Sequence, residues 1–120
     1  MDWKLDDSRP IWQQLSQQLT RRIITGIYPP GSKLPSVREL AAEAGVNPNT
    51  MQRALAQLEQ DGLAKADRTA GRLVTRDTAV LDGVRRVEAQ SIIRQYLDAM
   101  EALGYSKDRA ASLLQEEEEA

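Results

Sequence analysis

Hydrogen-bonding side chains are concentrated in a short segment near the middle of the chain. Within seven residues lie Asn47, Asn49, Thr50, Gln52 and Arg53. Asn and Gln can pair with adenine, Arg with guanine, and Thr with a phosphate or with the methyl group of thymine. Such side chains in the first two turns of one helix can therefore read base edges in a DNA groove. For Asn47, a helix cap without any ligand is the alternative.

Catalytic and metal-binding chemistry has few residues available. The 120-residue sequence contains neither cysteine nor histidine, which excludes disulfides, thiol nucleophiles, Cys/His zinc sites and imidazole acid–base catalysis. Carboxylates alone would have to carry a reaction, and Glu43, Glu59 and Asp61 fall on ordinary helix surfaces. We therefore expect no enzyme activity, no metal and no cofactor. We also expect a cytoplasmic protein without membrane contact, because the apolar runs are too short to span a bilayer.

Net charge differs between two parts of the chain. The formal net charge is −2, but residues 1–76 hold 11 basic and 8 acidic residues, whereas residues 77–120 hold 5 and 10. The first part is therefore cationic and the second anionic, which suggests separate tasks. A chain of this length has room for one small core and an appendage.

The first helix is expected to have Ser8 as its N-cap and to end at Gly26 and the cluster of residues 29–31. Its apolar stripe consists of Ile11, Leu15, Leu19, Ile23 and Ile27. Gln14 and Arg22 fall opposite this apolar stripe, so the pattern puts them on the solvated face. The preceding residues 3–6 are expected to form a short edge strand.

A helix-turn-helix unit is predicted next. Ser36 and Glu39 have the spacing of a capping box that opens a short helix, and Gly45 ends that helix. Two residues later Asn47 can cap another helix, whose buried stripe starts at Met51. Two helices joined by a short turn that contains Gly are typical of the helix-turn-helix motif, in which the second helix can lie in the major groove.

A β-hairpin follows the helix-turn-helix unit. Residues 63–67 and 72–75 have the composition of short strands on either side of a turn that contains Arg68 and Gly71. The order of helix, helix-turn-helix and hairpin is that of a winged helix. Arg68 and Arg72 could enter or straddle a minor groove; a solvated hairpin without a ligand is the alternative.

The segment PPGSKLPSVRELAAEAGVNPNTMQRALAQLEQDGL resembles the GntR family of bacterial transcription regulators. The family pattern P-x-G-x-x-L-P-S-x-R-x-L-A, then V-x-x-x-T, then A-L-x-x-L and a Gly, is matched by Pro30, Gly31, Leu34, Pro35, Ser36, Arg38, Leu40, Ala41, Val46, Thr50, Ala54, Leu55, Leu58 and Gly62. The resemblance covers residues 10–75, and the short tail resembles the YtrA-like branch, which lacks a large effector domain. It implies a winged-helix regulator that binds double-stranded DNA.

Ten residues are the candidates for DNA contact: Arg38, Asn47, Asn49, Thr50, Gln52, Arg53, Arg68, Thr69, Gly71 and Arg72. Arg38 could grip a phosphate or a guanine with two hydrogen bonds; a salt bridge with Glu39 or Glu43 is the alternative. The family's Gly-rich hairpin tip would place Gly at position 69, where this chain has Thr69. The departure puts close approach of the hairpin backbone to DNA in question.

The last part of the chain is expected to form a helical hairpin. Residues 78–103 have helical periodicity, and Ser106 can cap another helix. A second copy of the chain is expected to cover the apolar residues Val84, Val87, Ile92, Ile93, Tyr96, Leu97, Met100 and Leu103. The alternative is that these helices fold back on their own DNA-binding domain. The acidic run 116–119 opposes the helix dipole and is expected to fray.

These patterns predict a mainly α chain with a small β-hairpin. A winged helix-turn-helix domain over residues 1–76 is expected to precede a helical dimerisation region with an acidic tail over residues 77–120. The function implied is that of a sequence-specific transcriptional regulator, a repressor that binds a palindromic operator as a homodimer. The alternative is a winged-helix module that binds protein without specific DNA binding. A small-molecule effector is left open.

Overall fold

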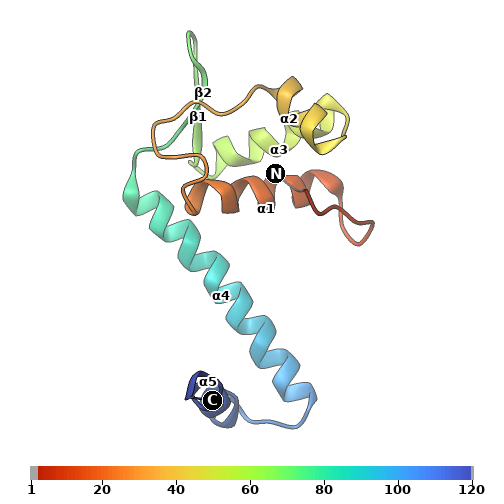
Figure 1. Cartoon of the computed structure of the whole chain (residues 1–120), viewed down its shortest axis with the longest axis vertical. Helices are drawn as coiled ribbons and strands as arrows, with labels where there is room; N and C mark the ends of the chain where they lie inside the picture. The colour runs from red at the N-terminus through yellow and green to blue at the C-terminus, as the bar shows by residue number, and fades with distance from the viewer. Residues whose placement is uncertain (1–2, 120) are drawn as a thin grey trace. The chain divides into compact units, whose positions relative to one another are not determined.

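The computed structural model describes residues 3–119, which form five helices and one two-stranded hairpin (Figure 1). The elements are α1 (Ile11–Ile24), α2 (Val37–Ala44), α3 (Pro48–Gln60), β1 (Ala64–Asp67), β2 (Gly71–Val74), α4 (Thr78–Ala102) and α5 (Lys107–Glu119). The predicted fold class is confirmed. Two compact units meet at Gly83, inside α4, whereas the functional boundary expected at residue 76 stays a prediction.

Three helices build the core of the first unit. Both α1 and α2 pack against α3, and Leu15 of α1, Leu40 of α2 and Leu55 of α3 are completely buried. Burial of each such side chain contributes about 1.5–3 kcal/mol. The buried stripe predicted for α3 is confirmed, since Met51 and Leu58 are also inaccessible to solvent. Neither α2 nor α3 is long enough to be stable alone, so this shared core holds them in place.

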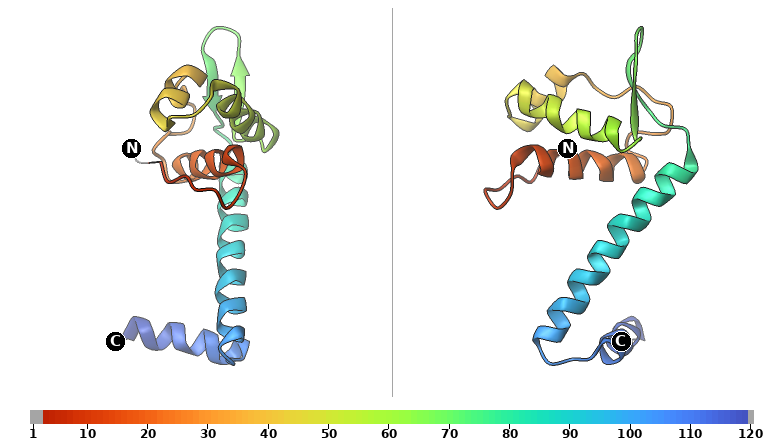
Figure 2. Two further views of the ribbon diagram at one scale, coloured as in Figure 1. Left: turned by 90° about the vertical axis from the view of Figure 1, so that its right-hand side faces the viewer. Right: turned by 180° about the vertical axis from the view of Figure 1, so that it is seen from behind.

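The hairpin projects away from the three helices (Figure 2). Strands β1 and β2 are antiparallel, with Ala64 opposite Val74 at the base and Asp67 opposite Gly71 near the tip. At the base, the Val74 amide donates to the Ser32 carbonyl over 2.9 Å, and Val74 is buried. The base of the hairpin is therefore attached to the core, while its tip extends beyond it.

The start of α1 differs from its predicted position, whereas its end agrees with the stop predicted at Gly26. The N-cap position is Pro10, and Ser8 instead donates from its amide and its hydroxyl to the Asp6 carboxylate. The helix ends at Ile24, because Gly26 adopts a φ of +83° and turns the chain away. Ile27 consequently lies beyond the helix and is 49% exposed, so its assignment to the buried stripe was wrong.

The edge strand expected at residues 3–6 does not form; glutamine side chains of α1 hold this segment instead. The Lys4 amide donates to Gln18 Oε1 over 3.1 Å, and Gln18 Nε2 donates to the Lys4 carbonyl over 2.8 Å. Gln14 makes the same pair of bonds with Asp6 and donates a further one to the Arg9 carbonyl. Gln14 is buried as a result, which corrects its placement on the solvated face.

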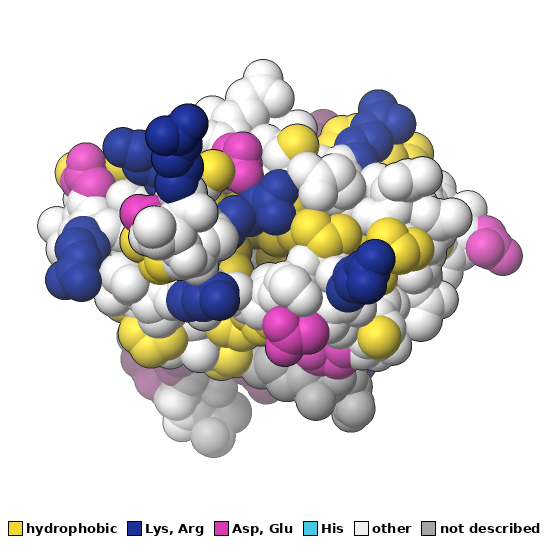
Figure 3. All heavy atoms as spheres, turned by 90° about the horizontal axis from the view of Figure 1, so that it is seen from above, with side chains coloured by type: hydrophobic (Ala, Val, Ile, Leu, Met, Phe, Trp, Pro, Cys, Tyr) yellow, Lys and Arg dark blue, Asp and Glu magenta, His cyan; other side chains and the backbone are white. Residues whose placement is uncertain are grey.

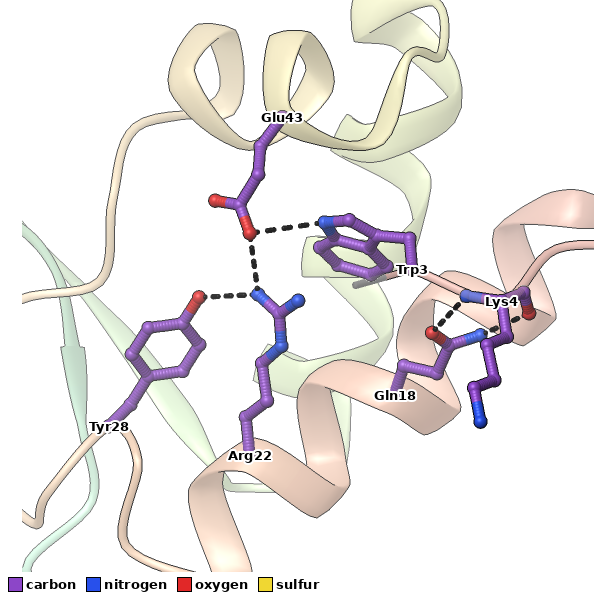
Figure 4. A network of polar contacts seen from close by, with 6 residues as sticks. All are labelled: Trp3, Lys4, Gln18, Arg22, Tyr28 and Glu43. Carbon is purple, nitrogen blue, oxygen red and sulfur yellow. Dashed lines mark hydrogen bonds and ion pairs between the residues drawn. The ribbon is translucent and has the colours of Figure 1, made fainter. Parts of the chain in front are cut away.

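Arg22 is buried rather than solvated. Its guanidinium lies 4.1 Å from the centre of the Trp3 ring, and its Nη1 donates to Tyr28 Oη over 2.8 Å and to Glu43 Oε1 over 3.2 Å (Figure 4). Trp3 Nε1 donates to the same carboxylate oxygen over 3.2 Å. The network joins four parts of the chain around one cation: the N-terminal segment, α1, the loop that follows α1, and α2 itself. Such satisfied pairing is what allows an arginine to be buried.

Replacing Arg22 with alanine is expected to lower the free energy of unfolding by about 2 kcal/mol, because Glu43 then loses its partner and Trp3 loses the surface it covers. The value is reduced from that of a fully buried pair because the Glu43 side chain is 36% exposed. Urea denaturation measures the change. Gln13→Ala, at an exposed position of the same helix, should shift it by less than about 0.5 kcal/mol. Equal effects of the two substitutions would contradict the network's role.

The second unit consists of the remainder of α4 together with α5. Ser106 caps α5 as predicted, since its Oγ accepts from the Arg109 amide over 3.1 Å. Tyr96 Oη donates to the Ala110 carbonyl over 2.7 Å, and Ala110 is buried. The acidic run is helical as far as Glu119, and its fraying stays a prediction. An ion pair of 2.8 Å between Arg109 and Glu116 offsets part of the repulsion between these carboxylates and the C-terminal end of the helix dipole.

Candidate nucleic-acid interface

Helix α3 presents its polar residues around one buried stripe. Asn47 Oδ1 accepts a hydrogen bond of 2.7 Å from the Asn49 amide, so the cap predicted for this residue is present. Asn49, Gln52 and Arg53 are exposed and Thr50 is half-buried. The helix start is thereby held by Asn47, while the next exposed side chains are available to a partner outside the fold.

The exposed residues of α3 do not all lie on the same side of the helix. Gln52 and Glu59 are seven residues apart and therefore share a side. Glu59 contacts the hairpin through Arg72, which identifies this as the hairpin side. Arg53 lies on the α1 side, where its guanidinium stacks 4.2 Å from the centre of the Trp12 ring. Gln52 is thus better placed than Arg53 to reach a duplex that also contacts the hairpin.

Arg38 is exposed on the first turn of α2. Its predicted ion-pair alternatives are not formed within the described residues, because both carboxylates have other partners. Glu39 accepts from the Ser36 amide, completing a capping box, and this backbone hydrogen bond lowers the pKa of the Glu39 carboxyl. Glu43 pairs with Arg22. The Arg38 guanidinium is therefore available for an external anion.

An open groove of about 360 Å³ runs between the start of α2 and the hairpin. Its lining includes three cations, Lys33, Arg38 and Arg72, beside Gly71. Basic side chains are spread over the face of the molecule that carries α2, α3 and the hairpin (Figure 3). Lys33 was absent from the predicted contacts; the signal that could have found it is its place in the turn directly before α2. A groove of this charge favours a phosphate backbone.

The hairpin tip is ordered by the Asp67 side chain. Its Oδ1 accepts from the amides of Ala70 and Thr69, each over 2.9 Å, and from Thr69 Oγ1 over 2.8 Å. These bonds, with the Ala70 amide first, lower the pKa of the Asp67 carboxyl. The left-handed conformation at the tip is taken by Gly71, with a φ of +85°, and not by Thr69. The departure from a Gly-rich tip therefore imposes no backbone strain at position 69.

Acid is expected to loosen this tip. A lowered pKa in the folded chain means that the Asp67 carboxylate stabilises the tip fully above its ordinary value of 3.8. That contribution is lost as the pH falls from 3.8 through the lower pKa that the carboxyl has in the folded chain. Amide chemical shifts of Thr69 and Ala70 should therefore stay constant at neutral pH and move only in that acidic window. A transition of these amides near neutrality would contradict the assignment, and Asp67→Asn should abolish the acidic one.

Arg72 is not a free cation of the hairpin. Its Nε donates to Glu59 Oε1 over 2.6 Å, with exposed fractions of 20% and 34% for the two side chains. Arg68, at the tip, is exposed. The structure therefore divides the two predicted wing arginines into one that is bound to α3 and one that extends toward solvent.

The residues predicted for dimerisation fall into two groups. Val84, Tyr96, Leu97 and Met100 are half-buried, whereas Val87, Ile92, Ile93 and Leu103 are 66%, 54%, 55% and 73% exposed. At 100° per residue, Ile92 and Ile93 fall on one side of α4 together with Tyr96 and Met100, and Val87 lies on the other. Leu103 lies in the turn directly after α4. One side of α4 thus leaves several large apolar side chains in water.

Membrane and metal sites are not indicated in residues 3–119. No helix there has both the length and the apolar character needed to cross a bilayer. No group of three or more acidic side chains in the same residues is arranged to hold a metal ion.

Residues 12–74 match the model of a family described as bacterial regulatory proteins, gntR family. The chain belongs to this family. It is 32% identical over 108 residues to the uncharacterized HTH-type transcriptional regulator YhcF of Bacillus subtilis, covering 90% of this chain and 89% of YhcF. It is 35% identical over 94 residues to the HTH-type transcriptional repressor YtrA of the same organism, covering 77% and 72%.

Solved structures of GntR-family proteins share the fold. A GntR family transcriptional regulator from Listeria monocytogenes aligns with a TM-score of 0.85 at 34% identity, over 93% of this chain and 98% of that one. YtrA from Sulfolobus acidocaldarius aligns with a TM-score of 0.58 at 30% identity, over 78% and 96%. The predicted YtrA-like resemblance and winged helix-turn-helix fold are therefore confirmed. The chain is a GntR-family transcriptional regulator with a DNA-binding helix-turn-helix, and the relatives it matches are regulators rather than enzymes.

Proposed function

We propose that this GntR-family chain is a repressor that binds a palindromic operator as a homodimer. The observation that carries the proposal is the cationic groove between α2 and the hairpin, beside the hairpin side of α3 on which the exposed Gln52 lies. Helix α3 would enter the major groove, with Asn49 and Gln52 at base edges. Arg38 and Lys33 would hold the phosphate backbone, and Arg68 would approach the adjacent minor groove.

Thr50, Arg53, Thr69 and Gly71 have supporting parts in this proposal. Thr50 and Arg53 would contact phosphates at the edge of the groove. Thr69 and Gly71 would shape the hairpin tip, given the hydrogen bonds of Thr69 to Asp67 and the φ of Gly71. Asn47 would act through its cap on the start of α3.

A homodimer is proposed because one copy offers few cations. A monomer that contacts a few phosphates binds weakly at physiological salt, whereas two linked copies combine their contacts. The exposed apolar side chains Ile92 and Ile93 on one side of α4, with Leu103 in the turn after it, are the surface that a second copy would cover. A symmetric dimer then requires an operator with two-fold related half-sites, about one helical turn or a multiple of it apart.

Repression is proposed by analogy with YtrA of Bacillus subtilis, which is described as a transcriptional repressor. A dimer that occupies a promoter would exclude polymerase by steric overlap.

Selection from a random-sequence duplex library tests the proposal. The duplexes retained by the purified chain are expected to contain an inverted repeat, and sedimentation should show a dimer on each. A reporter gene placed behind the selected sequence is expected to fall in expression when the chain is supplied. Retention without any shared sequence would instead favour the protein-binding alternative, and an increase in reporter expression would contradict repression.

A further inference from the structure

We propose that Glu59 is a positioning residue for DNA binding, which acts by holding Arg72 and thereby setting the angle between the hairpin and α3. The inference rests on the proposed function as a DNA-binding protein. It gives Arg72 a role inside the protein in place of a contact with DNA. It also gives a role to Glu59, an acidic residue on helix α3, although α3 would bind DNA, which is a polyanion.

The outer half of the hairpin has few other attachments. A two-stranded hairpin is at best marginally stable by itself. Along β1 only Ala64 is buried, and Lys65, Ala66 and Asp67 are exposed. Backbone hydrogen bonds attach β2 on its other edge, the outermost running from the Leu34 amide to the Arg72 carbonyl over 2.9 Å. Beyond Ala64, the side chains of β1 are exposed. They therefore do not fix the tilt of the hairpin over α3.

The Arg72–Glu59 contact supplies that missing restraint. A distance of 2.6 Å from Nε to Oε1 is that of a charge-assisted hydrogen bond, which is short and directional. Arg72 lies opposite Ala66 in the hairpin, and Arg68 lies two residues beyond Ala66. A tilt that began at Arg72 would therefore displace the tip, and Arg68 with it.

Glu59 also lies on the side of α3 that would meet the duplex. It shares this side with Gln52, two helical turns away. Holding the hairpin at this point therefore relates the base-reading residues of α3 directly to the hairpin tip. When two contacts must form together on one rigid duplex, the affinity is higher if the protein already holds them at the right spacing before it binds.

A competing explanation predicts the opposite sign. If Arg72 left Glu59 to bind a phosphate, then Glu59 would compete with DNA for the guanidinium. Its removal would also take away a negative charge near a polyanion, and affinity would rise. The positioning role requires that affinity falls although a negative charge is removed.

The test uses the full chain and a duplex that it has selected from a random library. Glu59→Ala is expected to weaken binding by roughly fivefold to tenfold, with an unchanged slope of log affinity against log salt concentration. Glu59→Gln, which keeps an acceptor for Arg72 without the charge, should lose less. Arg72→Ala should match Glu59→Ala, and the double substitution should cost no more than either one, because both remove the same link.

Asp61→Ala is the matched control. Asp61 is the other acidic residue at this end of the helix, and it accepts from Gln57 rather than from the hairpin. Its removal should leave affinity equal or slightly higher. Binding by Glu59→Ala as tight as or tighter than the parent, or a salt slope reduced by about one in Arg72→Ala, would overturn the inference alone. Failure of the parent chain to select any duplex would overturn the proposed function with it.

Discussion

Ile93→Glu is expected to leave the chain monomeric at micromolar concentration and to weaken its binding to a selected operator by at least about a hundredfold. Ile93 is 55% exposed on the apolar side of α4. A second copy that covers this position would have to desolvate an unpaired carboxylate, which a dimer interface does not tolerate. Sedimentation equilibrium and mobility shift measure the two effects.

Gln95→Glu is the control for this substitution. It adds the same charge to the same helix at an exposed polar position, about 200° around α4 from Ile93. It should leave both assembly and affinity within about twofold of the parent. A dimeric Ile93→Glu chain would place the interface elsewhere, and a monomer with full affinity would contradict the need for two copies.

Arg38→Ala is the second substitution with a large expected effect. Each guanidinium lost from a bidentate contact costs about 1–3 kcal/mol, and a dimer loses two of them. Affinity should therefore fall by about thirtyfold or more. Thermal stability should not change, because Arg38 is exposed and the carboxylates beside it have other partners.

The pattern of loss identifies the atom that Arg38 contacts. A lost phosphate contact weakens selected and random duplexes alike and lowers the salt slope, whereas a lost guanine contact weakens the selected duplex only. Arg86→Ala, which removes an exposed arginine from α4, is the matched control and should leave affinity within about twofold. An affinity of Arg38→Ala equal to that of the control would remove Arg38 from the interface.

Local signals allowed most of the helix-turn-helix to be predicted from sequence. The Ser36 capping box, the left-handed Gly45 and the Asn47 cap all depend on residues within a few positions of one another. Short-range geometry of this kind is visible in a sequence. The same holds for the Ser106 cap of α5.

Long-range contacts account for what could not be predicted. Helical periodicity puts Arg22 on the polar side of α1, and the periodicity is correct, but Trp3 and Glu43 cover that side from distant parts of the chain. A strand was expected at residues 3–6 because no local pattern reveals that side chains of α1 would satisfy its backbone. For the same reason, the pairing of Arg72 with Glu59 has no signature in the sequence.

The two tryptophans of the chain each lie against a guanidinium, Trp3 on Arg22 and Trp12 on Arg53. Indole emission responds to a cation held over its ring and to the removal of that cation. In a Trp3→Phe variant, the remaining fluorescence would come from Trp12 and would follow Arg53 as α3 meets a duplex. If Arg53 contacts the duplex as proposed, Trp12 would report DNA binding, and titrations could be followed without an attached dye.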